Sequence, residues 1–261
     1  MTGLRVAVGQ LAATEDAVAN AAAAAALLAR AADEGARLVV LPEYTIAWAP
    51  RLHAGLAAEH RRFADTLAEA AARHGVLAVA GTLEPVGDRM RNVALAVGPD
   101  GTTIGRYTKV HLFDAFGVQE SEVLDAGDPG DPVVLDVDGW RVGLATCYDL
   151  RFPESFRVLV DAGADVLAVG AAWAAGPGKP EQLRVLAQAR ALENTSYLLL
   201  ASQCGRGRVG GSAVVGPLAS ELATADGEPQ LLVADLDREH LEEVRRTVPS
   251  LAHRRYAVVP R

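Results

Sequence analysis

The chain has 261 residues, 50% of them hydrophobic, and a formal net charge of -8 at pH 7. This length and apolar content can form a large core, in one α/β domain or in two small ones. Basic residues occur in pairs, such as Arg61-Arg62 and Arg254-Arg255, whereas phosphate binding needs clustered lysine and arginine. We therefore expect no nucleic-acid partner.

The N-terminal part of the sequence shows neither a targeting signal nor a membrane span. MTGLRVAVGQLAA lacks a charged segment followed by an apolar one, so we expect no signal peptide. Asn20 and Arg30 interrupt the alanine-rich run 17–32, which predicts a helix packed on one side and not a membrane span. We therefore expect no membrane as a partner. We expect a cytoplasmic protein, where two cysteines rarely form a disulfide. Without a nearby histidine pair, two cysteines also argue against a zinc site.

Short apolar runs alternate with longer helical stretches along the chain. The predicted strands are 4–8, 38–41, 76–81, 93–97, 142–145, 166–170, 197–202, 213–215 and 231–235. The predicted helices are 15–34, 56–74, 154–162, 181–193 and 239–246. This alternation predicts one layered α/β domain over residues 1–261, with hairpins that make the sheets mixed. We expect the tail 249–261 to be irregular or extended and to pack on a partner subunit.

Polar residues follow two of the apolar strands directly. In RLVVLPEYT, Pro42 ends strand pairing and leaves the carboxylate of Glu43 pointing into a cleft. In GRYTKVHLFD, a strand would place Lys109 on the same side as Tyr107 and His111. A partly desolvated lysine there can stabilise an oxyanion and lower the pKa of a nearby thiol. The alternatives are a solvated glutamate in a loop and an exposed lysine.

A cysteine occupies the same kind of position in GLATCYDLRFPE. Cys147 lies between the strand 142–145 and a helix start at Pro153-Glu154. A thiol at such a turn is near free backbone N–H groups, which can lower its pKa and hold an oxyanion. A buried, inert cysteine is the alternative, and Cys204 is interpreted in that way. Together the three segments supply the base, the electrostatic stabiliser and the nucleophile that acyl transfer requires.

The motifs LPEY, YTKVHLF and CYDLRFPE, in this order, resemble those of the nitrilase superfamily of carbon–nitrogen hydrolases. The resemblance covers nearly the whole chain and implies a four-layer αββα sandwich with mixed sheets, assembled as a homodimer or a larger oligomer. It implies that Glu43 is the general base, Lys109 the oxyanion stabiliser and Cys147 the nucleophile. Glu120 in VQESEVLDAGD is implied as a second catalytic glutamate, with Glu122 as a close alternative. No metal and no organic cofactor are implied.

The resemblance also implies a mechanism and a substrate class. Cys147 would attack a carbonyl carbon, while Lys109 and the backbone N–H of Tyr148 hold the oxyanion. Ammonia would leave, and water would release the acid from a thioester. CYDLRFPE resembles the Nit-type amidases, which act on ω-amides of small dicarboxylic acids and on deaminated glutathione. The alternatives are a nitrilase, an N-carbamoyl amide hydrolase with the same triad, and an inactive scaffold.

Three residues are candidates for binding a small amide substrate. Arg151 could hold a substrate carboxylate with its guanidinium, or it could pair with Glu154 or Asp149 and brace the turn. Trp173, in AAWAAGPGKPEQ, could line the acyl pocket or belong to the core. Tyr44, next to the implied general base, is the third candidate.

The segment GRGRVG matches the GxGxxG pattern of dinucleotide-binding loops through Gly205, Gly207 and Gly210. A dinucleotide site also requires a helix directly after the loop, so that the pyrophosphate meets a helix N-terminus. The segment that follows, GSAVVGP, is typical of a strand. We therefore expect a glycine-rich connection between two strands and no bound nucleotide.

Overall fold

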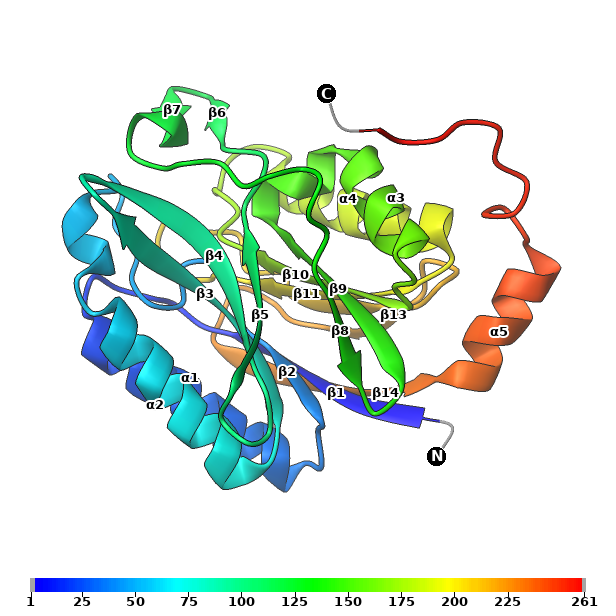
Figure 1. Cartoon of the computed structure of the whole chain (residues 1–261), viewed down its shortest axis with the longest axis horizontal. Helices are drawn as coiled ribbons and strands as arrows, with labels where there is room; N and C mark the ends of the chain where they lie inside the picture. The colour runs from blue at the N-terminus through cyan, green and yellow to red at the C-terminus, as the bar shows by residue number, and fades with distance from the viewer. Residues whose placement is uncertain (1–2, 260–261) are drawn as a thin grey trace.

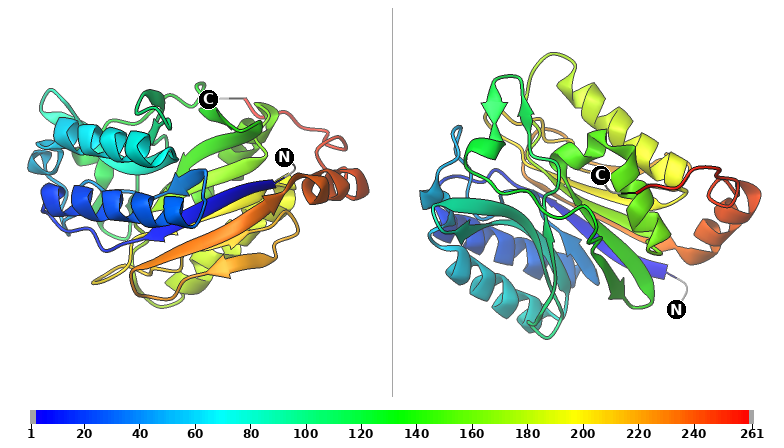
Figure 2. Two further views of the ribbon diagram at one scale, coloured as in Figure 1. Left: turned by 90° about the horizontal axis from the view of Figure 1, so that it is seen from below. Right: turned by 45° about the horizontal axis from the view of Figure 1, so that its top comes forward.

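The computed structural model describes residues 3–259, which form four layers (Figure 1). Two six-stranded mixed sheets pack face to face, and helices cover the outer face of each sheet (Figure 2). The predicted fold class, an αββα sandwich with mixed sheets, is confirmed.

The first sheet comes from the N-terminal half of the chain and one C-terminal strand. Its order is β14-β1-β2-β3-β4-β5, in which β1, β2 and β3 are parallel to one another and the outer pairs are antiparallel. Its strands and the two helices connected to them are β1 (Gly3–Gln10), α1 (Ala17–Asp33), β2 (Leu38–Val40), α2 (His60–His74), β3 (Leu77–Val86), β4 (Arg89–Val97), β5 (Thr103–Thr108) and β14 (Gln230–Asp237).

The second sheet repeats this plan, with the order β13-β12-β11-β10-β9-β8 and three parallel central strands. Its elements are β8 (Val134–Val137), β9 (Trp140–Thr146), the 3-10 helix η3 (Cys147–Arg151), α3 (Pro153–Asp161), β10 (Val166–Ala171), α4 (Lys179–Asn194), β11 (Tyr197–Ser202), β12 (Ala213–Val215) and β13 (Glu221–Thr224). The connection between the two halves holds a small hairpin and a turn, β6 (Asp114–Ala115), β7 (Val118–Gln119) and η2 (Glu120–Glu122).

Side-chain alternation along the strands builds separate cores. Val6 and Val166 are buried between the two sheets, whereas Ala7 faces α1 and α2, and Leu167 faces α3 and α4. Central strands that are buried on both faces appear in the sequence as continuous apolar runs, which explains why these strands were predicted correctly.

The alanine-rich run forms α1, and its buried side chains lie on one face, as predicted. Asp16 caps this helix, because its carboxylate accepts hydrogen bonds from the N–H groups of Val18 and Ala19 at 3.0 Å. Within residues 3–259, no helix combines the length and the hydropathy needed to cross a membrane.

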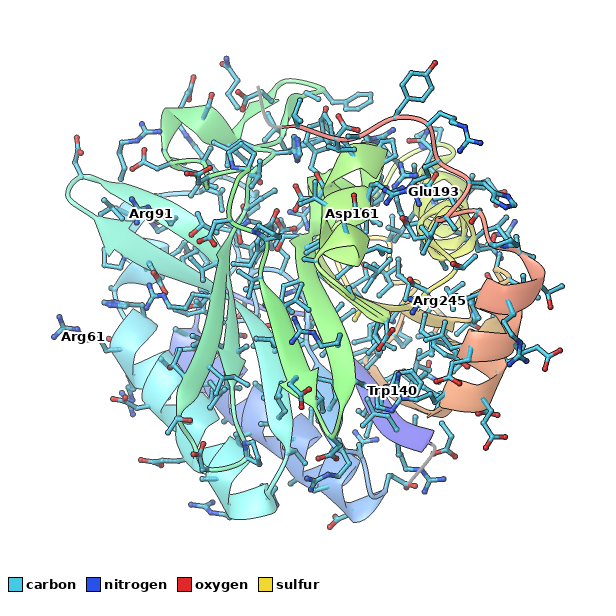
Figure 3. The ribbon with its side chains drawn as sticks, turned by 45° about the vertical axis from the view of Figure 1, so that its right-hand side comes forward. Arg61, Arg91, Trp140, Asp161, Glu193 and Arg245 are labelled. Atoms are coloured by element: carbon cyan, nitrogen blue, oxygen red, sulfur yellow. The ribbon has the colours of Figure 1, made fainter. Side chains whose placement is uncertain are left out.

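Helix α5 (Arg238–Thr247) and the following tail lie beside the second sheet, where Figure 3 labels Asp161 and Arg245. Arg245 Nη1 bonds to Asp165 Oδ1 at 2.7 Å, and Arg254 pairs with Asp161 of α3. After a short turn, the described part of the tail is irregular, and Tyr256 is 92% exposed. The last two residues of the predicted tail, 260 and 261, lie outside the described residues.

Every predicted strand and helix has a counterpart in the structure, but some predicted bounds are wrong. The helix expected over 56–74 begins only at His60, after a 3-10 turn over Ala54–Ala57. The strands expected over 76–81 and 93–97 are parts of one longer hairpin, β3–β4. The apolar pattern missed the tip of this hairpin because its side chains are partly exposed and polar residues interrupt the run.

Two glycines allow close approach of the segment that carries Glu43. A Cβ atom on Gly81 of β3 would lie 2.5 Å from the backbone nitrogen of Tyr44 and 2.6 Å from Glu43 Cα. A Cβ atom on Gly170 of β10 would lie 2.8 Å from the backbone nitrogen of Glu43. Only glycine permits these approaches, so one strand of each sheet fixes the position of the Glu43 turn.

Gly81→Ala should therefore destabilise the protein by about 1–3 kcal/mol, because the new methyl group must push the backbone away. Urea unfolding of this variant and of Gly227→Ala measures the effect. A Cβ atom on the exposed Gly227 would meet nothing within 4 Å, so that control should be close to neutral. Equal stability losses in the two variants would contradict this account of the close approach.

Candidate active site

A buried lysine lies at the centre of a group of charged residues. Lys109 is 1% exposed, and its Nζ donates to Glu43 Oε1 at 2.9 Å and to Glu120 Oε2 at 2.8 Å. Burial opposes the charge of the ammonium, but the two carboxylates outweigh it and raise the pKa of Lys109 above its ordinary value. Lys109 therefore stays positively charged, and the alternative of an exposed lysine is wrong.

Glu43 follows β2 and is 1% exposed, so the alternative of a solvated loop glutamate is also wrong. Its Oε1 accepts a hydrogen bond from Asn92 Nδ2 at 2.8 Å, in addition to the one from Lys109. Its Oε2 accepts from the backbone N–H of Ala172, also at 2.8 Å. Gln203 Nε2 donates to the backbone carbonyl of Glu43 at 3.0 Å. The carboxylate is thus held in one position by groups from both sheets.

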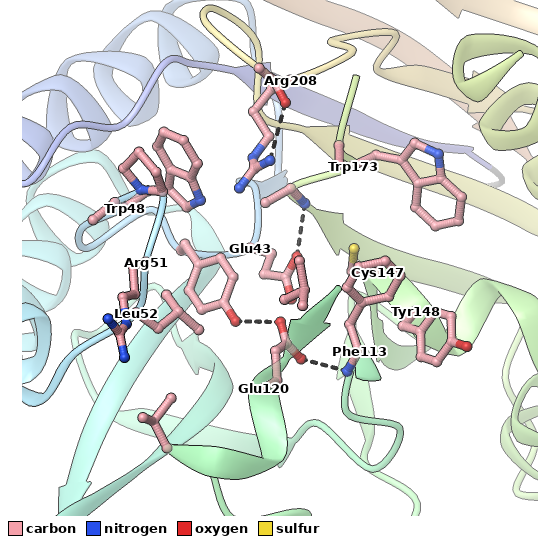
Figure 4. A pocket seen from close by; sticks show the side chains of 18 of the residues that line it. Glu43, Trp48, Arg51, Leu52, Phe113, Glu120, Cys147, Tyr148, Trp173 and Arg208 are labelled. Carbon is pink, nitrogen blue, oxygen red and sulfur yellow. Dashed lines mark hydrogen bonds between the residues drawn. The ribbon is translucent and has the colours of Figure 1, made fainter. Parts of the chain in front are cut away.

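Glu120 lies in η2, after the small hairpin. Its Oε1 accepts from the hydroxyl of Tyr44, and its Oε2 from the backbone N–H of Phe113, both at 2.8 Å (Figure 4). Burial raises the pKa of this carboxyl, but Lys109 outweighs that effect and holds the pKa below its usual value. The alternative, Glu122, is exposed, so Glu120 is the glutamate that the structure brings to Lys109.

A strained turn carries Cys147 between β9 and η3. Its φ is +48°, in the left-handed region that non-glycine residues rarely adopt. The buried carboxylate of Asp149 braces this turn, because it accepts hydrogen bonds from Thr146 N at 2.8 Å and from the Tyr107 hydroxyl at 2.7 Å. His111 Nδ1 lies 2.7 Å from the same carboxylate.

The strand predicted through YTKVHLF ends earlier than expected. β5 stops at Thr108, so Lys109 does not share a face with Tyr107 and His111. The chain leaves the sheet at this point, and the side chains diverge: Lys109 reaches the two glutamates, whereas the two rings reach Asp149.

The thiol of Cys147 is buried, with the residue 8% exposed. Burial raises its pKa above the ordinary value of 9.0, and the nearby Glu43 carboxylate raises it further. Lys109 and the backbone N–H of Ala172 lower it by less. The expectation that this turn lowers the thiol pKa is therefore wrong, because burial and the carboxylate outweigh the positive groups. At rest the thiol is protonated and close to a carboxylate that can accept its proton.

A cavity of about 1180 Å³ opens onto these groups (Figure 4). Its lining combines the acidic, lysine and thiol groups with aromatic rings and four further cations. The lining includes Glu43, Lys109, Glu120, Glu122 and Cys147, the rings of Tyr44, Trp48, Phe113, Tyr148 and Trp173, and the cations of Arg51, Lys179, Arg206 and Arg208. A concave, largely apolar site with converging polar groups is typical of small-molecule binding. Within the described residues, no three His, Cys, Asp or Glu side chains are arranged to hold a metal ion.

The substrate-binding candidates differ in their placement. Tyr44 and Trp173 line the cavity, and Trp173 is also 5% exposed, so it belongs to both the wall and the core. Arg151 is absent from the lining. Its Nη2 donates to Gln182 Oε1 at 2.7 Å, and its guanidinium carbon lies 5.1 Å from the ring centroid of Trp173. Arg151 therefore bonds to Gln182 of α4 and not to either of the carboxylates that the sequence suggested.

The glycine-rich segment connects β11 to β12, as predicted, so a strand and not a helix follows it directly. Sequence reasoning nevertheless missed Arg208 within this segment, since GRGRVG was considered only as a glycine pattern. It also missed Trp48, which follows the Glu43 turn. The only sequence signal for Arg208 was the alternation of arginine and glycine in GRGRVG, and this pattern is common in exposed loops.

The chain is similar in sequence to a known protein family and to several characterised relatives. Residues 5–246 match the carbon–nitrogen hydrolase family. The chain is 36% identical to the deaminated glutathione amidase of Escherichia coli O157:H7, over 97% of each chain. It is 30% identical to the human omega-amidase, over 99% of this chain and 98% of the relative.

A solved structure gives chemical information about a related site. A variant of the amidase from Nesterenkonia sp. AN1 aligns with a TM-score of 0.83 and 29% sequence identity. The alignment covers 97% of this chain and 94% of that chain. That structure shows covalent addition of the acetamide moiety of fluoroacetamide at its active-site cysteine.

The raised thiol pKa generates a prediction for Glu43→Gln. Removing the carboxylate charge should lower the pKa of Cys147, since Lys109 then acts on the thiolate without an opposing charge. A pH titration of the thiolate ultraviolet absorbance measures this, with Cys147→Ala as the background. The exposed Glu122→Gln is the matched control and should leave the midpoint unchanged. A wild-type midpoint below neutral pH, or an upward shift in Glu43→Gln, would contradict the account.

Proposed function

This chain belongs to the carbon–nitrogen hydrolase family, and we propose that it is a cysteine-dependent amidase of the Nit type. One observation carries the proposal: a thiol, a carboxylate and a buried ammonium, contributed by separate segments, open onto a single cavity. The amidase relatives, and the adduct on the cysteine of the Nesterenkonia enzyme, support the same chemistry.

The first half of the reaction is acylation of Cys147. Glu43 accepts the thiol proton as the sulfur attacks the carbonyl carbon of the amide. A protonated thiol beside an ionised carboxylate suits this step, because the proton moves as the new bond forms. Lys109 and the backbone N–H of Tyr148 stabilise the negative oxygen of the tetrahedral intermediate.

The second half regenerates the thiol. Glu43 returns its proton to the leaving nitrogen, which departs as ammonia or an amine and leaves a thioester on Cys147. Glu43 then removes a proton from water, and the resulting hydroxide attacks the thioester carbonyl. The second tetrahedral intermediate collapses to a carboxylic acid and a thiolate, which takes the proton from Glu43. Throughout, Glu120 holds the ammonium of Lys109 and the hydroxyl of Tyr44.

We propose a small linear amide that bears a carboxylate as the substrate class. An ω-amide of a dicarboxylic acid and deaminated glutathione are the two candidates that the relatives suggest. Four cations around the cavity of a chain with net charge -8 also favour an anionic substrate. Tyr44 and Trp173 would pack against the acyl chain, since their rings line the wall. Arg151 lies outside the cavity lining, with its Nη2 bonded to Gln182.

We further propose that residues 1–261 act as one catalytic domain in a cytoplasmic homodimer. Cys147 and Cys204 are both free, which suits a reducing compartment. The tail presents Tyr256 and Val259, both largely exposed, as contacts for a partner subunit. Light scattering of the full chain should give twice the chain mass, and truncation before Tyr256 should shift the equilibrium toward monomer. An unchanged mass after truncation would contradict a role for the tail.

The activity prediction compares the two cysteines. Wild type should release ammonia or amine from α-ketoglutaramate or deaminated glutathione near neutral pH. Cys147→Ala should lose at least about 10³-fold in kcat, because the nucleophile is absent. Cys204→Ala is the matched control and should retain activity. Turnover restricted to a nitrile or an N-carbamoyl amine would overturn the Nit-type assignment. No turnover of any of these compounds would contradict a hydrolase.

A second prediction separates the two neighbouring glutamates. Glu120→Gln removes one of the two charges that hold Lys109 and should lower kcat by about 10²–10³-fold, the usual effect of disturbing an oxyanion group. Glu122→Gln changes an exposed side chain of the same turn and should stay within about threefold of wild type. Steady-state kinetics on the best amide measures both variants. Equal losses would show that Glu120 has no special role.

A further inference from the structure

Arg208 is held firmly against the wall of the cavity. Its backbone forms an antiparallel β-bridge with Ala174, and Val209 N donates to the carbonyl oxygen of Trp173 at 3.0 Å. This wall segment also contains Ala172, whose N–H holds the Glu43 carboxylate. The segment that follows β10 therefore contacts both the Glu43 carboxylate and the backbone of Arg208, and it fixes the position of one relative to the other.

The guanidinium of Arg208 is oriented by an aromatic ring. Its central carbon lies 4.0 Å from the ring centroid of Trp48, and Nη1 donates to the carbonyl oxygen of Gly207 at 3.1 Å. Nε is buried and has no hydrogen-bond partner. Figure 4 shows the guanidinium beside Trp48 and above Glu43, on the side of the cavity opposite Tyr148. Stacking of this kind fixes the plane of a guanidinium and leaves its edges free for a ligand.

Arg208 lacks a counter-ion that a comparable arginine has. Arg190, which is buried, pairs with Glu193 at 2.8 Å, whereas no carboxylate of the described residues forms an ion pair with the half-buried Arg208. Burial lowers the pKa of Arg208, and the more distant charge of Glu43 opposes that effect. The Glu43 and Glu120 carboxylates already accept bonds from other groups. A partly desolvated cation without a partner is costly, and a bound anion would relieve that cost.

We propose that Arg208 selects for the carboxylate of the substrate, as the anion-binding residue of this cavity. The inference rests on the proposed amidase function. A guanidinium with free edges can give two parallel hydrogen bonds to a carboxylate, which a neutral amide cannot use. Two other cations are less suited: Arg151 lies outside the cavity lining, and the ammonium of Lys179 lies 3.8 Å from the ring centroid of Phe116.

Two amides of equal chain length test this selection. Glutaramate carries a terminal carboxylate, and pentanamide has a methyl group in its place. Arg208→Gln should raise KM for glutaramate about 10- to 100-fold, the usual loss for hydrogen bonds between charged groups. It should leave kcat/KM for pentanamide within about threefold of wild type. Arg61→Gln, an exposed change on α2 outside the cavity lining, controls for net charge and should have little effect on either amide.

Binding without turnover gives an independent readout. Calorimetry of glutaramate with Cys147→Ala should show binding that weakens about 10- to 100-fold when Arg208→Gln is added. Arg208→Lys keeps the charge without the paired donors and should recover part of this loss. Thermal melting of each variant confirms folding, and the lysine variant carries the test if the glutamine variant unfolds.

The outcomes separate this inference from the proposed function. Unchanged glutaramate kinetics in Arg208→Gln would overturn the inference and leave the amidase intact. Equal losses on both amides would assign Arg208 a structural role and also overturn it. Selectivity lost instead in Lys179→Gln or Arg151→Gln would place the anion site elsewhere. If wild type hydrolyses none of the amides and binds no glutaramate, the proposed function and the inference fail together.

Discussion

The site depends on one buried ammonium held between two carboxylates. Lys109 can stay charged in the interior because Glu43 and Glu120 surround it, and its charge in turn offsets the burial of the two carboxylates. Removing one member of such a group leaves an uncompensated buried charge, which costs far more than the loss of a surface ion pair. Two of these charges also act on Cys147: burial and Glu43 raise the pKa of its thiol, and Lys109 lowers it by less. The charges of Lys109, Glu43 and Glu120 therefore stabilise the buried site and also serve the proposed reaction.

The fold supplies this arrangement from strand ends. Glu43 follows β2, Cys147 follows β9 and Ala172 follows β10, so all three lie at the carboxyl ends of parallel strands in the two sheets. Ligand sites in α/β proteins commonly form at such ends, because the helical connections leave a crevice there. Gly81 and Gly170 bring the Glu43 turn close enough for the sheets to share it. Asp149 and its partners Tyr107 and His111 hold the strained Cys147 turn from the other side.

The sequence predicted the parts of the site that depend on local pattern. Glu43, Lys109 and Cys147 stood out because each follows an apolar strand, and the motifs carrying them resemble one family. Other features depend on packing between distant segments and could not be found in this way. The thiol pKa was predicted in the wrong direction because burial beside Glu43 is a tertiary effect. Arg208 went unnoticed because its contact with Trp48 joins segments far apart in the chain, and the bond from Arg151 to Gln182 was hidden for the same reason.

The central claim is that the Glu43–Lys109–Glu120 group enables Cys147 to form a covalent thioester during amide hydrolysis. The most direct measurement is mass spectrometry of the protein after acid quenching during turnover of the best amide, followed by peptide mapping. The account predicts a transient mass increase equal to the acyl group, located on the peptide that contains Cys147 and absent from Cys147→Ala. Rapid amide turnover with no adduct at any time point, or with an adduct on another residue, would contradict it.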